Sequence, residues 1–164
     1  MYYNDYEWAV IGYLQHYSDW KTFQHNAEIE IKALEANIAL DPAPKTSQFR
    51  DTPPIGGFES GGPQEAIYEQ KEDNLLRLKN LRTEKNKIDS MLTRIDNSLE
   101  ALDGPTRNMV IQRGVYRFSW KAIAHREGYD ESYCRKKWRD GIHRISGMLF
   151  GPKAAPVQTN LVFL

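Results

Sequence analysis

The stretch "SWKAIAHREGYDESYCRKKWRDGIHRI", residues 119–145, contains two helical patterns separated by a glycine. Ser119 is a favoured helix cap, Gly128 suits the end of the first helix, and Asp130 or Glu131 suits the start of the second. Apolar residues then recur at steps of three and four and share one face of that second helix: Cys134, Trp138, Ile142, Ile145 and Leu149. The stretch therefore predicts two helices joined by a short turn, the second ending near residue 149.

A third short helix is predicted just before this stretch. In "LDGPTRN", Asp103 and Gly104 end a preceding helix, and Pro105 suits the first turn of the next. The helix of about 105–115 should turn Met109 and Val110 inward, with Tyr116 as a further candidate. The following helix should bury three residues: Trp120, Ile123 and Ala124. Three helices with a Gly turn between the last two form a helix-turn-helix pattern, whose final helix lies in the major groove of DNA.

The net charge of zero conceals two oppositely charged parts. Residues 1–104 carry 11 Lys and Arg against 18 Asp and Glu, a balance of −7. Residues 105–164 carry 11 against 4, a balance of +7. A basic segment of this kind is typical of nucleic-acid binding, because Lys and Arg replace the counterions condensed on phosphates.

The inward face of the last helix determines which basic residues face outward. If Cys134, Trp138 and Ile142 are buried, the residues between them must lie on outer or flanking faces. The predicted base and phosphate contacts are Ser132, Tyr133, Arg135, Lys136 and Arg139. The predicted backbone contacts from the supporting helices are Lys121, Arg126, Arg113 and Arg117. The alternative is a solvated basic face with no ligand.

Residues 64–103 contain a long uninterrupted helical pattern. Steps of four and three define a seam along it: Ile67, Lys71, Asn74, Leu78, Leu81, Lys85, Ile88, Leu92, Ile95, Leu99 and Leu102. Such a helix is too long for one small domain to cover. Its partner is either the helix at 19–40, in a hairpin, or a second copy of the chain. The polar seam positions either set the register or mean that the seam begins near Leu78.

The N-terminal part predicts helices at about 6–16 and 19–40, or one bent helix, with Asp5 able to cap its start. Residues 41–63 are rich in Pro and Gly and predict a flexible linker, or a docking segment around Phe49 and Phe58. The tail, 151–164, should be irregular. Its apolar end "LVFL" either docks on a surface or is disordered.

Nothing in the sequence indicates catalysis, a metal or a cofactor. A single cysteine excludes an intramolecular disulfide and a zinc site built on several cysteines. The four histidines, His16, His25, His125 and His143, do not form a metal-binding motif, and the Gly-rich "IGGFESGG" lacks the Lys of a phosphate loop. Because no catalytic motif is present, we expect no enzyme. With neither a membrane span nor a signal peptide, we expect a soluble, cytoplasmic protein.

Residues 99–149 resemble region 4 of the sigma-70 family of transcription factors. The likeness is in the order of features: "RNMVIQRGVY" as a first helix, "WKAIA" in the second, and a Gly-Tyr turn before a basic, Ser-containing helix. With a Pro/Gly linker and a long helix in front, the layout is similar to phage-encoded late transcription regulators of Gram-positive bacteria, of the RinA and ArpU type. No sigma region 2 is found, which favours a regulator over a sigma subunit.

The resulting expectation is an all-α protein in five segments. These are an N-terminal helical segment (1–40), a linker (41–63), a long coiled-coil-like helix (64–103), a sigma-70 region 4-like helix-turn-helix domain (104–150) and a tail (151–164). The resemblance implies a sequence-specific regulator that binds double-stranded DNA at late promoters in a bacterial host and acts through host RNA polymerase. The seam of the long helix predicts a homo-oligomer formed through that helix. The alternatives are an adaptor or inhibitor of RNA polymerase without DNA readout, and a packaging factor similar to a terminase small subunit.

Overall fold

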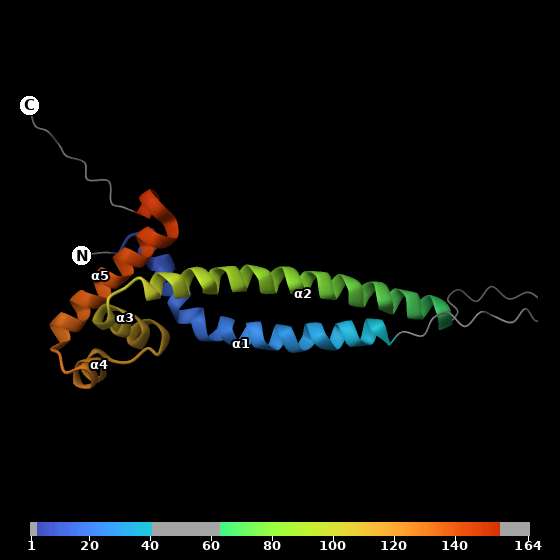
Figure 1. Cartoon of the computed structure of the whole chain (residues 1–164), viewed down its shortest axis with the longest axis horizontal. Coiled ribbons are helices and arrows are strands. Elements are labelled where there is room, and N and C mark those ends of the chain that lie inside the picture. Colours follow the sequence, from blue (N-terminus) through green and yellow to red (C-terminus); the bar gives the residue numbers. More distant parts are fainter. Residues whose placement is uncertain (1–2, 41–62, 155–164) are drawn as a thin grey trace, which may run out of the picture. The chain divides into compact units, whose positions relative to one another are not determined.

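The structure, a computed structural model, describes residues 3–40 and 63–154. Its helices are α1 (Asp5–Ala39), α2 (Pro63–Glu100), α3 (Gly104–Val110), α4 (Trp120–Glu127) and α5 (Glu131–Phe150) (Figure 1). A π-helical turn (Ile111–Val115) extends α3, and a 3-10 turn (Gly151–Ala154) follows α5. Within the described ranges there is no strand, so the all-α prediction is confirmed. The predicted linker through residue 62 and the tail beyond residue 154 lie outside these ranges.

The chain divides into two compact units. The core unit comprises Met1–Thr22 and Ile88–Leu164, and the hairpin unit comprises Phe23–Lys87. This division differs from the predicted segments, because both long helices contribute to both units. The start of α1 and the end of α2 belong with the short C-terminal helices.

The first helix begins with a reciprocal cap at Asn4 rather than at Asp5. Asn4 Oδ1 accepts the Glu7 N–H at 2.8 Å, and Glu7 Oε2 accepts the Asn4 N–H at 2.9 Å. The prediction of Asp5 as the cap was therefore wrong. The break considered near Ser18 does not occur, and α1 is one continuous helix. Because no Pro interrupts the chain near Ser18, the preference of Ser18 and Asp19 for helix caps does not outweigh the hydrogen bonds of the continuing helix.

In the hairpin unit, α1 and α2 pair in antiparallel fashion. Ala27 and Leu34 of α1 and Leu78 of α2 are buried. Ion pairs flank these residues: Glu28 with Lys85 at 3.3 Å, Glu30 with Arg77, and Glu35 with Arg82. Of the two partners left open for the α2 seam, the structure therefore contains the hairpin within the chain.

The predicted seam of α2 matches the pattern of burial. Leu78, Leu92, Ile95, Leu99 and Leu102 are buried, and the other seam positions from Lys71 onward are half-buried. Ile67 is the exception, at 51 % exposed. The seam thus begins near Lys71, and Lys85 is kept in it by its ion pair with Glu28.

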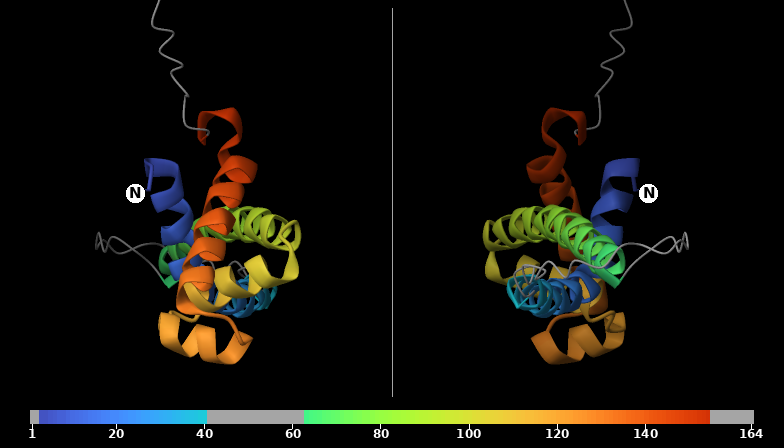
Figure 2. Two further views of the ribbon diagram at one scale, coloured as in Figure 1. Left: turned by 90° about the vertical axis from the view of Figure 1, so that its left-hand side faces the viewer. Right: turned by 90° about the vertical axis from the view of Figure 1, so that its right-hand side faces the viewer.

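The core unit is centred on α5. Its main cluster combines α1, α2, α3 and α5 through Val10, Ile11, Leu14, Ile95, Leu99, Leu102, Val110, Trp138, Ile142, Ile145 and Leu149. In Figure 2 the first turns of α1 stand beside the upper half of α5, with α3 and α4 against its lower half. With seven and eight residues, α3 and α4 are too short to cover the 20-residue α5. Segments from the other end of the chain complete its core.

The inward residues of the last three helices are largely as predicted. Met109, Val110 and Ile123 are fully buried, as are the five apolar positions of α5 to within 8 %. Trp120 and Ala124 are only half-buried, and Tyr116 is 60 % exposed. The Tyr116 N–H donates to the Ile111 carbonyl in the wider π-helical turn, which shifts this residue off the buried α-helical stripe.

Candidate nucleic-acid interface

The turn between α4 and α5 is fixed by local caps. Ser119 Oγ accepts the Ala122 N–H at 3.2 Å, and Asp130 Oδ1 accepts the Tyr133 N–H at 2.8 Å. Gly128 ends α4 with φ 71°, a left-handed conformation that glycine adopts without steric cost. The predicted start and end of α4 are thus confirmed, and Asp130 is the cap of α5.

The inner face of α5 is held by buried side chains of α3 and α4 and by Tyr3, which precedes α1. Cys134 is fully buried and packs with Met109 and Ile123. Burial raises the pKa of the Cys134 thiol, because the thiolate would lose its hydration. The Trp138 indole N–H donates to the Tyr3 hydroxyl at 2.9 Å. These contacts fix the rotation of α5 about its axis and so determine which residues face outward.

The outer face of α5 carries a hollow, here called the α5 hollow. It is lined by Glu131, Ser132, Arg135, Lys136, Arg139 and Asp140. Four of the nine predicted DNA contacts therefore lie together: Ser132, Arg135, Lys136 and Arg139. Their spacing along three successive turns places one polar group and three cations on one outer face. The lining also contains two carboxylates: Glu131 in the first turn of α5 and Asp140 in the middle of the helix.

Arg135 is positioned by two neighbours within the protein. Its Nη2 lies 3.0 Å from Glu131 Oε2, and its guanidinium carbon lies 5.7 Å from the Trp120 ring centroid. The two charged side chains are 57 % and 45 % exposed. An exposed helical pair at this spacing contributes only about 0.3–0.5 kcal/mol, so an anion can replace Glu131 at little cost.

Tyr133 lies beside the α5 hollow rather than in its lining. Its ring is half-buried, with its centroid 4.6 Å from that of Tyr129. Lys137 Nζ lies 5.7 Å from the Tyr133 ring centroid and 3.8 Å from Asp103 Oδ2. Tyr133 therefore belongs to an aromatic pair on the flank of the helix, in the turn region where α5 begins.

Arg113 and Arg117, two of the residues predicted to contact the DNA backbone, already donate hydrogen bonds to carbonyl groups of the core unit. Arg113 Nη1 donates to the Phe118 carbonyl at 2.9 Å, and its guanidinium lies 4.9 Å from the Trp120 ring centroid. Arg117 has φ 57°, and its Nη2 donates to the Gln15 carbonyl at 3.2 Å. Both guanidinium groups support the π-helical turn and the loop after it. Each guanidinium has five N–H donors, so a phosphate contact by either would use the other donors of a side chain that is already positioned.

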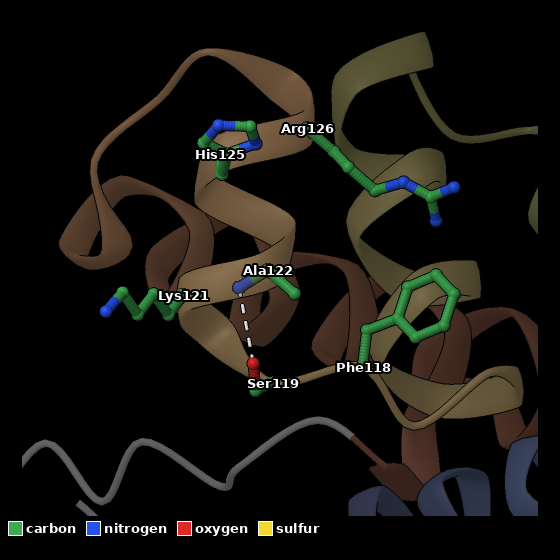
Figure 3. Close-up of a pocket in the computed structure, with 6 residues that line it drawn as sticks. All are labelled: Phe118, Ser119, Lys121, Ala122, His125 and Arg126. Atoms are coloured by element: carbon green, nitrogen blue, oxygen red, sulfur yellow. Dashed lines mark hydrogen bonds between the residues drawn. The ribbon is translucent and has the colours of Figure 1, made fainter.

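Lys121 and Arg126, the other two residues predicted to contact the DNA backbone, line a different hollow on the exposed face of α4. This α4 hollow is formed by Phe118, Ser119, Lys121, Ala122, His125 and Arg126 (Figure 3). Lys121 and Arg126 extend from opposite sides of α4 in this view. The nine predicted residues thus separate into the α5 hollow, its flank, the supporting loop and the α4 hollow.

Sequence reasoning missed Phe118 and His125 as surface-forming residues. The spacing of "WKAIAHR" places Ala122 and His125 away from Ile123, so for His125 the signal was present in the helical periodicity. Phe118 precedes α4 and packs partly against the cluster of Met109, Ile123 and Cys134, which the periodicity of α4 does not indicate.

No group of His, Cys, Asp or Glu suitable for holding a metal ion occurs in the part of the chain that the structure describes. The described helices include none with the length and apolar character needed to cross a membrane. No family model matches this chain, and neither a curated protein nor a solved structure matches it.

Proposed function

We propose that this protein is a sequence-specific DNA-binding transcription regulator. In this proposal α4 and α5 form a helix-turn-helix similar to that of sigma-70 region 4, and α5 lies in the major groove of double-stranded DNA. The regulator is of the phage-encoded late type and acts on late promoters through host RNA polymerase. It acts without a catalytic site, metal or cofactor.

The observation that carries the proposal is the two-sided character of α5. One face is anchored through Cys134 and Trp138, and the opposite face presents the α5 hollow with its three cations. Arg135 and Arg139 have the planar donors that pair bidentately with guanine, and Lys136 suits guanine or phosphate. Ser132 near the start of α5 is placed for a phosphate or base edge. Because these anchors fix the rotation of α5, its cations keep one orientation relative to the DNA bases.

Selection of bound duplexes from a random library by the full-length protein tests the proposal. We expect a defined motif to be enriched. The double variant Arg135→Ala and Arg139→Ala should lose the preference for that motif, because each bidentate pair contributes about 1–3 kcal/mol of discrimination. Affinity should also fall with salt, with a slope of about −0.9 for each phosphate contacted.

A matched control removes two cations elsewhere. Lys79→Ala and Lys87→Ala change the net charge equally, on exposed positions of α2 in the hairpin unit. This control should retain motif recognition. Circular dichroism should show unchanged helix content in both double variants. Failure of any duplex to be enriched would overturn DNA readout and leave the adaptor or inhibitor of RNA polymerase, or the terminase-like packaging factor, as the remaining explanations.

The proposed homo-oligomer requires a surface other than the α2 seam, since α1 already covers it. In the hairpin unit, Ile29, Leu75 and Leu76 are 57 %, 46 % and 58 % exposed. We assign the contact with a second copy to Leu75 and Leu76, which are consecutive exposed leucines of α2. Leu75→Glu with Leu76→Glu should reduce the mass measured by light scattering to that of a monomer. If the mass is unchanged, a second copy does not bind at these residues.

A further inference from the structure

The α4 hollow has a composition that DNA readout does not explain. Its apolar lining residues, here called the floor, are Phe118, which precedes α4, and Ala122 on the exposed side of α4 (Figure 3). Ser119 Oγ is occupied as the cap of α4. An apolar floor on the outside of a short helix is suited to an apolar side chain of another molecule.

The floor is held in place by a stack of side chains. The Phe118 and Tyr116 rings are stacked with centroids 5.7 Å apart, and the Arg126 guanidinium carbon lies 4.8 Å from the Phe118 centroid. The Phe118 carbonyl also accepts the hydrogen bond from Arg113. Phe118 is therefore a positioned aromatic ring, of the kind that contributes strongly to protein interfaces.

The charged side chains that line the α4 hollow are all positive. Lys121 and Arg126 are the cations of the lining, and His125 adds an imidazole ring. Neighbouring Glu127 does not line the hollow, because its carboxylate accepts hydrogen bonds from Gln112 and Asn108. No carboxylate is among the lining residues, in contrast to the α5 hollow with Glu131 and Asp140. An acidic partner is complementary to this surface.

We propose that the α4 hollow binds an acidic, amphipathic helical segment of a partner protein. An apolar side chain of that segment lies on Phe118 and Ala122, and its carboxylates pair with Lys121 and Arg126. A DNA backbone supplies the negative charge but has no apolar side chain for the floor, so the observations favour a protein segment. This role goes beyond DNA readout by the α5 hollow and does not depend on it.

The test uses the full-length protein and a labelled helical peptide of about four turns, with Glu on its polar face and Leu and Phe on its apolar face. Two control peptides replace either Glu by Lys or the apolar residues by Ser. We expect the first peptide alone to bind, as measured by fluorescence anisotropy. Equal binding of the Ser control would show a purely ionic contact and overturn the proposal, as would no binding of the first peptide.

Charge reversal at the α4 hollow gives the sharper readout. Lys121→Glu with Arg126→Glu should weaken binding of the acidic peptide by at least about tenfold and permit binding of the Lys peptide, because complementary charge determines partner choice. Lys79→Glu with Lys87→Glu, on the hairpin unit, is the matched control and should leave acidic-peptide binding unchanged. Melting curves confirm that each variant is folded. Acidic-peptide binding that survives reversal at the α4 hollow would overturn the proposal.

A DNA measurement separates this inference from a backbone contact by the same cations. In this proposal Lys121 and Arg126 bind the partner segment instead of the phosphates expected from the sequence, so Lys121→Gln with Arg126→Gln should leave the salt dependence of duplex binding unchanged. A slope reduced by about two would mean that both residues neutralise phosphates, and the α4 hollow would then belong to the DNA interface. The Arg135 and Arg139 variants test the α5 hollow independently.

Discussion

Gly141 shows how closely α5 approaches α3. A Cβ added at Gly141 would lie 2.5 Å from Val110 Cγ2 and 2.9 Å from Thr106 Cγ2. Both neighbours are β-branched side chains on a short helix, so neither has a free rotamer into which it can move. A residue with no side chain is needed where the two helices cross, in the middle of the proposed reading helix.

Gly141→Ala should therefore lower the free energy of unfolding by about 1–3 kcal/mol through overpacking, despite the better helix propensity of alanine. Gly147→Ala is the matched control in the same helix, where an added Cβ has no atom within 4 Å. It should stabilise the protein by up to about 1 kcal/mol. Chemical denaturation of both variants measures the difference, and equal effects would show that α3 and α5 are not in close contact.

Glu131 is one of the two carboxylates that oppose anion binding in the α5 hollow, the other being Asp140. Its carboxylate pairs with Arg135 and must be displaced, or repelled, when a phosphate approaches. Glu131→Gln should strengthen duplex binding several-fold at low salt, with the gain shrinking as salt screens the charge. Glu69→Gln, exposed on α2, is the control for net charge. Duplex affinity that is unchanged by Glu131→Gln, in titrations at two salt concentrations, would place DNA away from this helix start.

At the scale of the elements, local sequence signals identified most helix ends of the core unit. Ser119, Gly128 and Asp130 act as caps because each satisfies a backbone group at its own helix end, a requirement that depends on nearby residues alone. The cap of α1 was misassigned because Asn4 and Asp5 are both favoured cap residues, and the choice depends on Glu7. Glu7 is also held at 3.0 Å by His143 Nδ1 of α5, a tertiary contact that sequence spacing does not reveal.

Asp103 is an N-terminal cap with a testable pH dependence. Hydrogen bonding from the Thr106 hydroxyl, at 2.8 Å, lowers the Asp103 pKa, with the Thr106 N–H and Lys137 acting in the same direction. Because the folded-state pKa is depressed, this carboxylate stabilises the fold above its unfolded pKa of about 3.9. That contribution is lost as the pH falls through the lower, folded value.

Asp103→Asn should consequently reduce the melting temperature at pH 7 and have a progressively smaller effect below pH of about 4. Asparagine is itself a good cap, so the difference reports the charge rather than the cap. Melting curves from neutral to acid pH measure it, with Asp73→Asn on an exposed position of α2 as the control. A difference between wild type and Asp103→Asn that is constant with pH would contradict the assignment.

At the scale of the whole molecule, the sequence predicted the helices but not how they combine. The periodicity of α5 identified its buried face, yet nothing in that pattern indicates that Val10 and Leu14 complete the core around it. The periodicity of α2 likewise identified a seam but left its partner open. Both gaps concern contacts between distant segments. Likewise, the helical pattern identified the outward residues of α5 but not the internal bonds of Arg113 and Arg117, which depend on loop geometry.

The composition of the core unit predicts that residues 104–154 do not fold on their own. Leu14 is 1 % exposed and would lie 2.9 Å from a Cβ at Gly114, so α1 closes directly over the π-helical turn. Without α1 and the end of α2, Trp138 and Ile142 would lose much of their burial. The isolated segment should show no cooperative melting by circular dichroism, whereas the full chain should.

In the full chain, Leu14→Ala should lower the free energy of unfolding by about 2–5 kcal/mol, because it opens a cavity in this core. Leu40→Ala is the matched control, a leucine 79 % exposed in the hairpin unit, and should cost within about 0.5 kcal/mol. Chemical denaturation measures both. A cooperatively melting 104–154 segment, or equal costs for the two leucines, would mean that α3, α4 and α5 form an independent domain and that α1 only covers its surface.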